Sequence, residues 1–263
     1  MKVLDGQDIL TRFMERLRSL PCRVLLLDYD GTLAPFHFDR TRAFPYSEVP
    51  ELLAQLIGLG TRVVLVSGRP APELVRLSGI VPPPEIWGSH GLERLLPDGR
   101  HELEPLIAQH AQTLERAAEL LRVNGLASRL ESKPGGVAVH WRGLASGERS
   151  SLRRRVLELW SPFLADGGLN LLNFDGGLEL RAPGKNKGDA VRTVLSETDA
   201  NAAVAYLGDD QTDEDAFRAL KGIGLAVLVR PARRLTSADV WLRPPKELLD
   251  FLREWLRAAG GEA

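Results

Sequence analysis

Short apolar runs that alternate with amphipathic stretches constrain the fold of this chain more than any other feature of its sequence. The runs Arg23–Tyr29 and Arg62–Val66 are rich in aliphatic side chains, and the segment between them, after Pro50, has apolar residues at helical spacing. The alternation returns near the end of the chain, in Lys187–Ser196, Ala203–Leu207, Glu214–Lys221 and Leu225–Val229. Strands that are apolar throughout are buried on both faces. The pattern therefore predicts an α/β fold, a doubly wound parallel sheet with helices on both faces.

The middle of the chain has a different pattern. Residues 104–123 have the apolar spacing of a long helix, and the strands expected after it alternate polar and apolar side chains. In Ala127–Lys133 and in a later strand, this alternation places Glu131, Lys133 and Glu179 on the exposed faces of their strands. A sheet with one wet face and one face packed on helices is typical of an α+β domain.

The change of pattern predicts the domain organisation. We expect an inserted α+β cap domain over residues 101–181 and a core domain formed by residues 1–100 and 182–263. The turn signals Pro97-Asp98-Gly99 and Pro183-Gly184 lie near the two boundaries and are the expected hinges.

Composition excludes several classes of partner. The chain has 263 residues, with 34 basic and 35 acidic side chains, so it offers no overall charge for binding nucleic acid or an anionic membrane. No apolar run approaches the roughly 18 residues that a membrane span needs. The single cysteine, Cys22, cannot form an internal disulfide, and residues 1–10 lack the pattern of a signal peptide. We therefore expect a cytoplasmic protein with a small-molecule partner; its oligomeric state cannot be read from the sequence.

Polar residues follow the predicted strands where the strands end. Asp28 and Asp30 come directly after the first strand, Ser67 follows the second, Asp209 follows a late strand, and Lys187 opens a helix. Each residue alone has an ordinary interpretation, such as a hydrophilic turn, a helix cap or a solvated lysine. Carboxyl ends of parallel strands form one edge of a sheet, however, and this edge is where ligands bind in α/β folds.

These residue types suit phosphoryl transfer. A carboxylate such as Asp28 can attack phosphorus, provided that a cation offsets the repulsion between two anions. Asp28 and Asp209, with Asp213 behind them, form an all-oxygen site suited to Mg²⁺. The Ser67 hydroxyl and the Lys187 ammonium can donate hydrogen bonds to phosphate oxygens. Asp30 can protonate the leaving oxygen and later activate water.

The ordered set of motifs resembles the haloacid dehalogenase superfamily of phosphatases, in which Asp-x-Asp-Gly-Thr, Ser, Lys and Gly-Asp-Asp occur in this order. Finer features resemble the trehalose-6-phosphate phosphatase family. They are Leu27-Asp28-Tyr29-Asp30-Gly31-Thr32-Leu33-Ala34-Pro35, Ser67-Gly68-Arg69, Ser89-His90-Gly91-Leu92-Glu93, Glu131-Ser132-Lys133, His140-Trp141-Arg142, Leu178-Glu179-Leu180, Asn186-Lys187-Gly188 and Gly208-Asp209-Asp210-Gln211-Thr212-Asp213-Glu214. Residues 36–42 depart from the usual continuation of the first motif, which leaves the conformation of that loop open.

For the core, the resemblance implies a nucleophile at Asp28 and an acid and base at Asp30. It implies that Mg²⁺ is held by Asp28, the Asp30 carbonyl and Asp209. Supporting roles fall to Asp213 and Asp210. Ser67 and Lys187 would bind phosphate.

For the cap, the resemblance implies that Glu131, Lys133 and Glu179 contact sugar hydroxyl groups. His140 is either a further sugar contact or a solvated strand histidine. His90 is either a structural residue beside the substrate or a general base or metal ligand.

The expected activity is the Mg²⁺-dependent hydrolysis of trehalose 6-phosphate to trehalose and phosphate, through an aspartyl-phosphate. Two alternatives stay open at this point. One is a phosphatase of another sugar phosphate, such as sucrose 6-phosphate or mannosyl-3-phosphoglycerate. The other is a catalytically silent sugar-phosphate sensor, which would have no need of both Asp28 and Asp30. A phosphomutase is disfavoured because nothing specific for a bisphosphate is visible.

Overall fold

The computed structural model describes residues 6–165, 168–174 and 176–261, which divide into two compact units. The core unit contains the residues up to 102 and those from 185 onward, and the insert contains residues 103–184. The boundaries expected from the sequence, 101 and 181, differ slightly from these. The division into a core domain and an inserted cap domain at residues 101 and 181 stays a prediction.

The core unit is built on one eight-stranded sheet with the strand order β12-β11-β10-β1-β2-β3-β4-β5. Pairing is parallel from β12 to β3, and β4 runs antiparallel to β3. The strands are β1 (Arg23–Leu27), β2 (Thr61–Val66), β3 (Glu85–Gly88), β4 (Glu93–Leu95), β5 (His101–Leu103), β10 (Ala203–Gly208), β11 (Leu225–Val229) and β12 (Val240–Leu242). Strands β4, β5 and β12 were not predicted, because strands of three residues are too short to show a periodic pattern.

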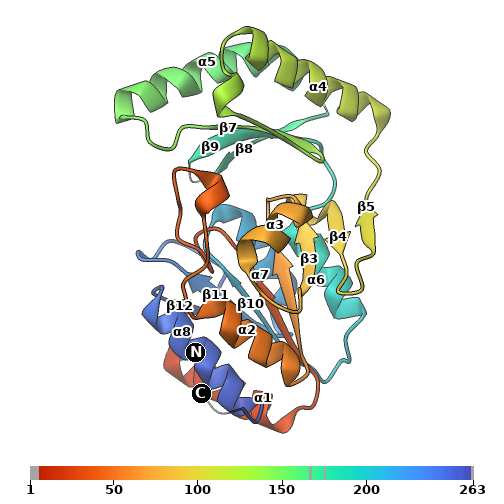
Figure 1. Ribbon diagram of the computed structural model, residues 1–263, viewed down its shortest axis with the longest axis vertical. Coiled ribbons are helices and arrows are strands. Elements are labelled where there is room, and N and C mark those ends of the chain that lie inside the picture. Colours follow the sequence, from red (N-terminus) through yellow and green to blue (C-terminus); the bar gives the residue numbers. More distant parts are fainter. Residues whose placement is uncertain (1–5, 166–167, 175, 262–263) are drawn as a thin grey trace. The chain divides into compact units, whose positions relative to one another are not determined.

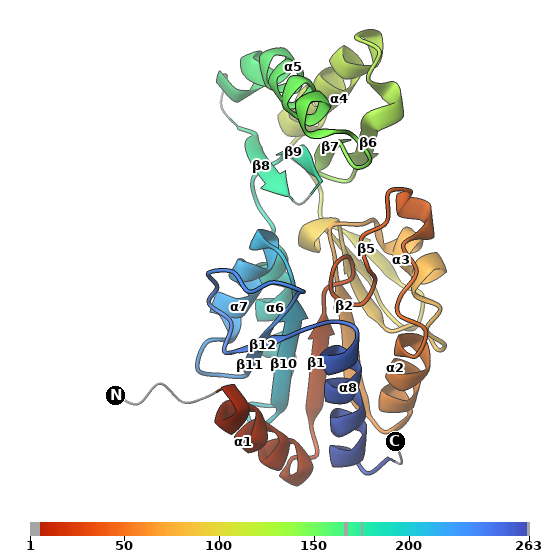
Figure 2. The same cartoon turned by 90° about the vertical axis from the view of Figure 1, so that its left-hand side faces the viewer.

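Helices cover both faces of this sheet, as Figure 2 shows. On one face lie α1 (Gly6–Ser19), α2 (Val49–Gly58), α3 (Ala71–Ser78) and α8 (Lys246–Ala258), and on the other lie α6 (Lys187–Ser196) and α7 (Glu214–Leu220). In the central strand, Leu25 and Leu27 pack into the first layer, whereas Val24 and Leu26 pack into the second. The predicted doubly wound sheet is therefore confirmed, with strands that are apolar on both faces because both faces are covered.

The insert is a four-stranded antiparallel sheet with two helices on one face (Figure 1). The sheet order is β6-β7-β9-β8, formed by β6 (Leu130–Lys133), β7 (Gly136–His140), β8 (Asn170–Phe174) and β9 (Gly177–Arg181). The helices are α4 (Ala108–Val123) and α5 (Ser146–Ala165), and Trp160 is fully buried between them and the sheet. Two expectations were wrong in detail: the first helix begins at Ala108 rather than 104, after Pro105, and Ala127–Arg129 is a 3₁₀ turn rather than strand.

In the described part of the chain, short 3₁₀ turns occupy four connections. They are η1 (Arg40–Arg42), η2 (Ser89–Gly91), η3 (Ala127–Arg129) and η4 (Gln211–Asp213). Of these, η2 and η4 come soon after strands β3 and β10 of the core sheet. Of the helices in the part of the chain that the structure describes, none combines the length and the apolar character that crossing a membrane requires.

Candidate active site

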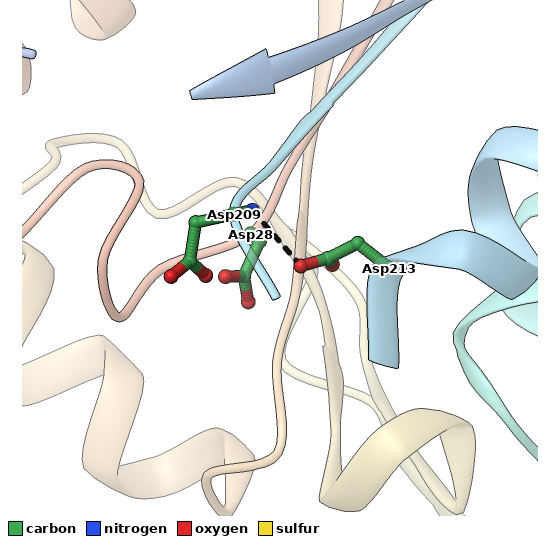
Figure 3. A group of neighbouring side chains, drawn as sticks. All are labelled: Asp28, Asp209 and Asp213. Atoms are coloured by element: carbon green, nitrogen blue, oxygen red, sulfur yellow. Dashed lines mark hydrogen bonds between the residues drawn. The ribbon is translucent and has the colours of Figure 1, made fainter. Parts of the chain in front are cut away.

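Three aspartates at the carboxyl edge of the core sheet form one cluster. Asp28 follows β1, Asp209 follows β10, and Asp213 ends the η4 turn. One carboxylate oxygen of each residue lies within 4.8 Å of the other two. All three side chains are buried, and Figure 3 shows the carboxylates of Asp28 and Asp209 side by side. The parallel pairing of β1 with β10 thus brings together motifs that lie far apart in the sequence.

Gly31 provides the space that this cluster occupies. A Cβ atom at this position would lie 2.2 Å from the Oδ2 atom of Asp209 and 2.8 Å from the ring of Phe36. Gly31 also has a φ angle of +85°, which residues with a side chain rarely adopt. The glycine of the Asp-x-Asp-Gly-Thr motif is therefore required by both the backbone and the neighbouring carboxylate.

Lys187 is the ammonium group of the cluster. It is the first residue of α6, whose start is fixed by a capping box between Asn186 and Asp189. Its Nζ atom donates to Oδ1 of Asp28 and to Oδ1 of Asp213, at 2.7 Å in both cases. The sequence predicted Lys187 at the start of a helix near the carboxyl edge of the sheet. The structure shows it in direct contact with the aspartate cluster.

Asp213 is held by four hydrogen-bond donors. Its Oδ1 atom accepts from Lys187 and from the Tyr206 hydroxyl at 2.6 Å, and its Oδ2 atom accepts from the backbone N–H groups of Asp209 and Asp210. The Asp209 bond is drawn in Figure 3. Direct metal ligation by Asp213 would compete with these bonds. The geometry therefore favours a role for Asp213 in orienting Lys187 and the Asp209 loop rather than in direct contact with a metal.

The cluster carries more negative charge than one lysine can balance. Burial raises the pKa of Asp28 to about 7, with Lys187 opposing the rise, and burial together with Asp28 raises the pKa of Asp209 well above its usual value. Burial works against the charge of Lys187, but Asp213 and Asp28 outweigh it and raise its pKa. The Oδ1 atom of Asp209 is buried and accepts no hydrogen bond from any residue that the structure describes. A bound cation would supply both the missing partner and the missing charge.

Ser67 lies at the same edge, after β2. Its backbone is anchored at both ends, because its N–H donates to Trp87 and its carbonyl accepts from the His90 N–H. Its Oγ atom accepts from the backbone N–H of Arg69 at 3.2 Å. A Cβ at Gly68 would lie 2.5 Å from the His90 ring, so the glycine lets the histidine pack against this turn. The contact supports the structural interpretation of His90.

Asp30 points to a different partner from the three clustered aspartates. Both of its carboxylate oxygens accept hydrogen bonds from the guanidinium group of Arg69, and its side chain is 22 % exposed. The structure therefore brings Asp28, Asp209, Asp213 and Lys187 together in one cluster. Asp30 follows Asp28 by two residues in the chain, but its carboxylate pairs with Arg69 instead.

In the insert, the four predicted sugar-binding residues lie on the sheet face that α4 and α5 leave uncovered. Lys133 Nζ lies 3.0 Å from Glu179 Oε2, and His140 Nε2 lies 2.6 Å from Glu131 Oε2. The predicted face is correct, because the alternate residues of these strands pack on the helices. The predicted exposure of Lys133 and Glu179 is wrong: their side chains are only 7 % and 4 % exposed.

The reason for this burial is the strand between the two charged residues. In the sheet register, Gly136 of β7 lies opposite Lys133 on one side, and Ala138 lies opposite Glu179 on the other. These small residues let the two long side chains meet above β7. A Cβ at Gly136 would lie 2.6 Å from Oε1 of Glu179.

Several residues that position the site through hydrogen bonds had no predicted role. Arg69 donates to Asp30, and Tyr206 donates to Asp213. Arg230 and Arg234 donate to the backbone carbonyls of the Asp209–Asp210 loop. One signal was visible for Tyr206, since a buried tyrosine in an otherwise aliphatic strand needs a partner for its hydroxyl group. Arg230 and Arg234 gave no such signal, because the loop carbonyls to which they donate belong to a distant segment of the chain.

Comparison with known proteins agrees with this arrangement. A sequence model of the trehalose-phosphatase family matches residues 26–239, which include every site residue described above. This chain belongs to the trehalose-phosphatase family. The resemblance inferred from the motifs is thereby confirmed.

Among other members of the trehalose-phosphatase family, the trehalose-phosphate phosphatase of Mycobacterium marinum is 35 % identical over 247 residues, covering 89 % of this chain and 61 % of that protein. The chain thus spans about three fifths of the length of this curated relative.

Solved structures confirm the fold. The C-terminal domain of trehalose-6-phosphate phosphatase from C. albicans has a TM-score of 0.78 at 20 % identity, with 96 % of this chain and 97 % of that chain covered. A phosphatase of the haloalkanoate (HAD) enzyme superfamily from Bacteroides thetaiotaomicron has a TM-score of 0.58 at 16 % identity, with 89 % and 95 % covered. The predicted haloacid dehalogenase-like core is therefore correct.

Proposed function

We propose that this chain hydrolyses trehalose 6-phosphate to trehalose and phosphate, using Mg²⁺ bound at the three-aspartate cluster. The observation that carries the proposal is the contact of Lys187 with both Asp28 and Asp213, beside a buried Asp209 oxygen that lacks a hydrogen-bond partner among the described residues. Membership of the trehalose-phosphatase family supports the choice of substrate.

The donor set of the cluster fits a hard divalent cation. Asp28 and Asp209 offer carboxylate oxygens, and both have raised pKa values, first of all through burial, that a cation would lower. We propose that these two residues and the Asp30 carbonyl hold Mg²⁺, with Asp213 and Asp210 in support. Mg²⁺ prefers such oxygen ligands, and when bound it would offset the repulsion between the phosphate and the Asp28 carboxylate.

In the proposed reaction, an Asp28 carboxylate oxygen attacks phosphorus and the bond from phosphorus to the sugar oxygen breaks. Asp30 gives its proton to that leaving oxygen. Asp30 then takes a proton from a water molecule, which attacks the phosphorus of the aspartyl-phosphate and releases phosphate and Asp28. Lys187 and the Ser67 hydroxyl donate hydrogen bonds to the phosphate oxygens, where charge develops during transfer.

Sugar recognition is assigned to the polar face of the insert. Lys133 and Glu179 form one pair there, and Glu131 and His140 form another. Together they offer both donors and acceptors, which a disaccharide with many hydroxyl groups needs. Their common face and close pairing support the proposal that these four residues bind the trehalose moiety.

A panel of sugar phosphates tests this function. Purified protein is incubated with trehalose 6-phosphate, sucrose 6-phosphate, mannosyl-3-phosphoglycerate and glucose 6-phosphate, and released phosphate is measured with Mg²⁺ and with EDTA. We expect the highest kcat/KM for trehalose 6-phosphate and loss of turnover in EDTA. Faster release from another sugar phosphate would reassign the substrate, and no release from any of them would favour the sensor alternative. A cytoplasmic location stays a prediction.

A further inference from the structure

We infer that Arg69 is a positioning residue that holds the Asp30 carboxylate in the orientation needed for proton transfer. The inference rests on the role proposed above for Asp30 as acid and base.

The contact between the two side chains is a two-point ion pair. The Nε atom of Arg69 lies 2.5 Å from Oδ2 of Asp30, and the Nη2 atom lies 2.7 Å from Oδ1. A planar guanidinium that meets a carboxylate at two atoms fixes the plane as well as the position of the carboxylate. A single hydrogen bond or a lysine would leave the carboxylate free to rotate.

Arg69 is itself held by partners other than Asp30. Its Nη1 atom donates to the Arg40 carbonyl at 2.8 Å and to the Glu73 carboxylate, one turn further along on α3. Its guanidinium also lies 5.8 Å from the centre of the Tyr29 ring. With Nη1 engaged in this way, the edge formed by Nε and Nη2 is presented to Asp30. The side chain of Arg69 is only 5 % exposed, so water does not compete strongly for it.

The loop that carries Asp30 does not need this ion pair to keep its backbone conformation. Gly31 donates to the Ala34 carbonyl at 2.7 Å, and the N–H groups of Leu33 and Ala34 donate to the Tyr29 carbonyl. These bonds close the turn around Asp30 without any side chain. The guanidinium therefore determines where the Asp30 carboxylate points rather than where its backbone lies.

Arg69 also connects Asp30 to the proposed phosphate-binding residue. The backbone N–H of Arg69 donates to Ser67 Oγ, and its carbonyl accepts from the Ser89 N–H. The same residue thus anchors a group proposed to bind phosphate and orients the group proposed to protonate the leaving oxygen. Arg69 thereby fixes the position of the proposed acid relative to the proposed phosphate-binding group, and this is the role of a positioning residue.

The dependence of rate on the leaving group tests the inference. A sugar alkoxide needs a proton from Asp30, whereas the phenolate of p-nitrophenyl phosphate leaves without one. We expect Arg69→Gln to lower kcat for trehalose 6-phosphate at least about tenfold, with little change in KM, and to lower kcat for the aryl ester less than about threefold. Asp30→Asn should show the same selective loss. The double variant should be no slower than Asp30→Asn alone, because Arg69 acts through Asp30.

Two further variants keep the result interpretable. Arg62→Gln is the matched control, because Arg62 pairs with two other carboxylates of the core unit, Glu85 and Glu197. In this variant the ratio of activity with trehalose 6-phosphate to activity with p-nitrophenyl phosphate should not change. Arg69→Lys keeps the charge without the two-point geometry, and it replaces Arg69→Gln if that variant does not fold by circular dichroism. It should show the same selectivity.

Equal losses with both esters in folded Arg69 variants would overturn the inference, as would additive losses in the double variant. If Asp30→Asn itself showed no selectivity for the leaving group, the proposed role of Asp30 would fail, and the inference about Arg69 would fail with it. Selectivity in Asp30→Asn without selectivity in the Arg69 variants would overturn the inference alone.

Discussion

The aspartate cluster of the core unit and the polar face of the insert differ in how their buried charges are compensated. In the core, Lys187 donates to two of the three clustered carboxylates, and one oxygen of the third, Asp209, is left without a hydrogen-bond partner among the described residues. In the insert, Lys133 and Glu179 are nearly as buried, and the Lys133 ammonium lies 3.0 Å from the Glu179 carboxylate. The first arrangement has a surplus of negative charge that an external cation would offset, whereas in the second an opposite charge lies beside each buried charge.

This difference agrees with the proposed division between chemistry in the core and recognition in the insert. Excess negative charge at the core favours a bound cation, which would in turn offset the charge of a phosphate. Two opposite charges side by side attract an ion less strongly, and the oxygens and ammonium protons of Lys133 and Glu179 can instead be shared with sugar hydroxyl groups. Variants in the two regions should therefore affect a sugar phosphate and a small aryl phosphate differently.

The largest effect is expected from Asp28→Asn. The substitution removes the proposed nucleophile and one metal-bound charge but is nearly isosteric, so the fold should persist. Turnover of trehalose 6-phosphate and p-nitrophenyl phosphate should fall together, to below about one per cent of the parent rate. Steady-state phosphate release measures this, with circular dichroism as the check on folding. Residual activity well above that level with either ester would contradict the aspartyl-phosphate route.

A smaller and selective loss is expected from Lys133→Ala and from Glu179→Ala. A lost charged hydrogen bond costs about 1.5–3 kcal/mol, so kcat/KM for trehalose 6-phosphate should fall at least about tenfold. Hydrolysis of p-nitrophenyl phosphate, which has no sugar to bind, should change less than about threefold. If both esters suffered equally, these residues would belong to catalysis or folding rather than to sugar recognition.

Gly136→Ala disturbs the geometry of the Lys133–Glu179 pair without removing either charge. The new Cβ would lie 2.6 Å from Oε1 of Glu179, so this carboxylate has to shift. We expect a loss of about threefold to tenfold in kcat/KM for trehalose 6-phosphate and none for the aryl ester, since a displaced carboxylate keeps part of its hydrogen bonding. Gly147→Ala is the control, because a Cβ there meets nothing within 4 Å. Equal behaviour of the two variants would argue against a role for the pair geometry.

The smallest effect concerns stability, and it follows from the charge surplus in the core. Burial raises the pKa of Asp28 from 3.8 to about 7, so the fold favours its protonated form. The contribution of Asp28 to stability is therefore fully present below pH 4 and is lost as the pH rises through about 7. Without metal, this loss lowers the melting temperature at pH 8 relative to pH 6.

The proposed Mg²⁺ site uses the ionised form of Asp28, so the rise in melting temperature that Mg²⁺ causes should be larger at pH 8 than at pH 6. Differential scanning fluorimetry with Mg²⁺ and with EDTA measures the two rises. In Asp28→Asn, which cannot ionise at this position, the difference between the two pH values should shrink. A rise that is independent of pH in the parent protein would contradict the proposed coupling of Asp28 to the metal.

Much of the fold was predictable because the local spacing of apolar residues indicates its helices and strands. Runs such as Arg23–Tyr29 are apolar throughout, and only a strand covered on both faces tolerates this composition. The alternation in the insert likewise identified the face on which Glu131 and Glu179 lie. The strands β4, β5 and β12 were missed because their stability comes from pairing with neighbours rather than from a pattern of their own.

The sequence by itself determined the motifs, their order and the chemistry of their side chains. A carboxylate, a hydroxyl and an ammonium group keep their chemistry in any fold, and strand ends at one sheet edge bring such groups together. Only the tertiary structure decided the partners. It paired Arg69 with Asp30, surrounded Asp213 with four donors, and buried Lys133 against Glu179. These contacts depend on distances between segments far apart in the chain, and such distances are set by packing, which leaves no local trace in the sequence.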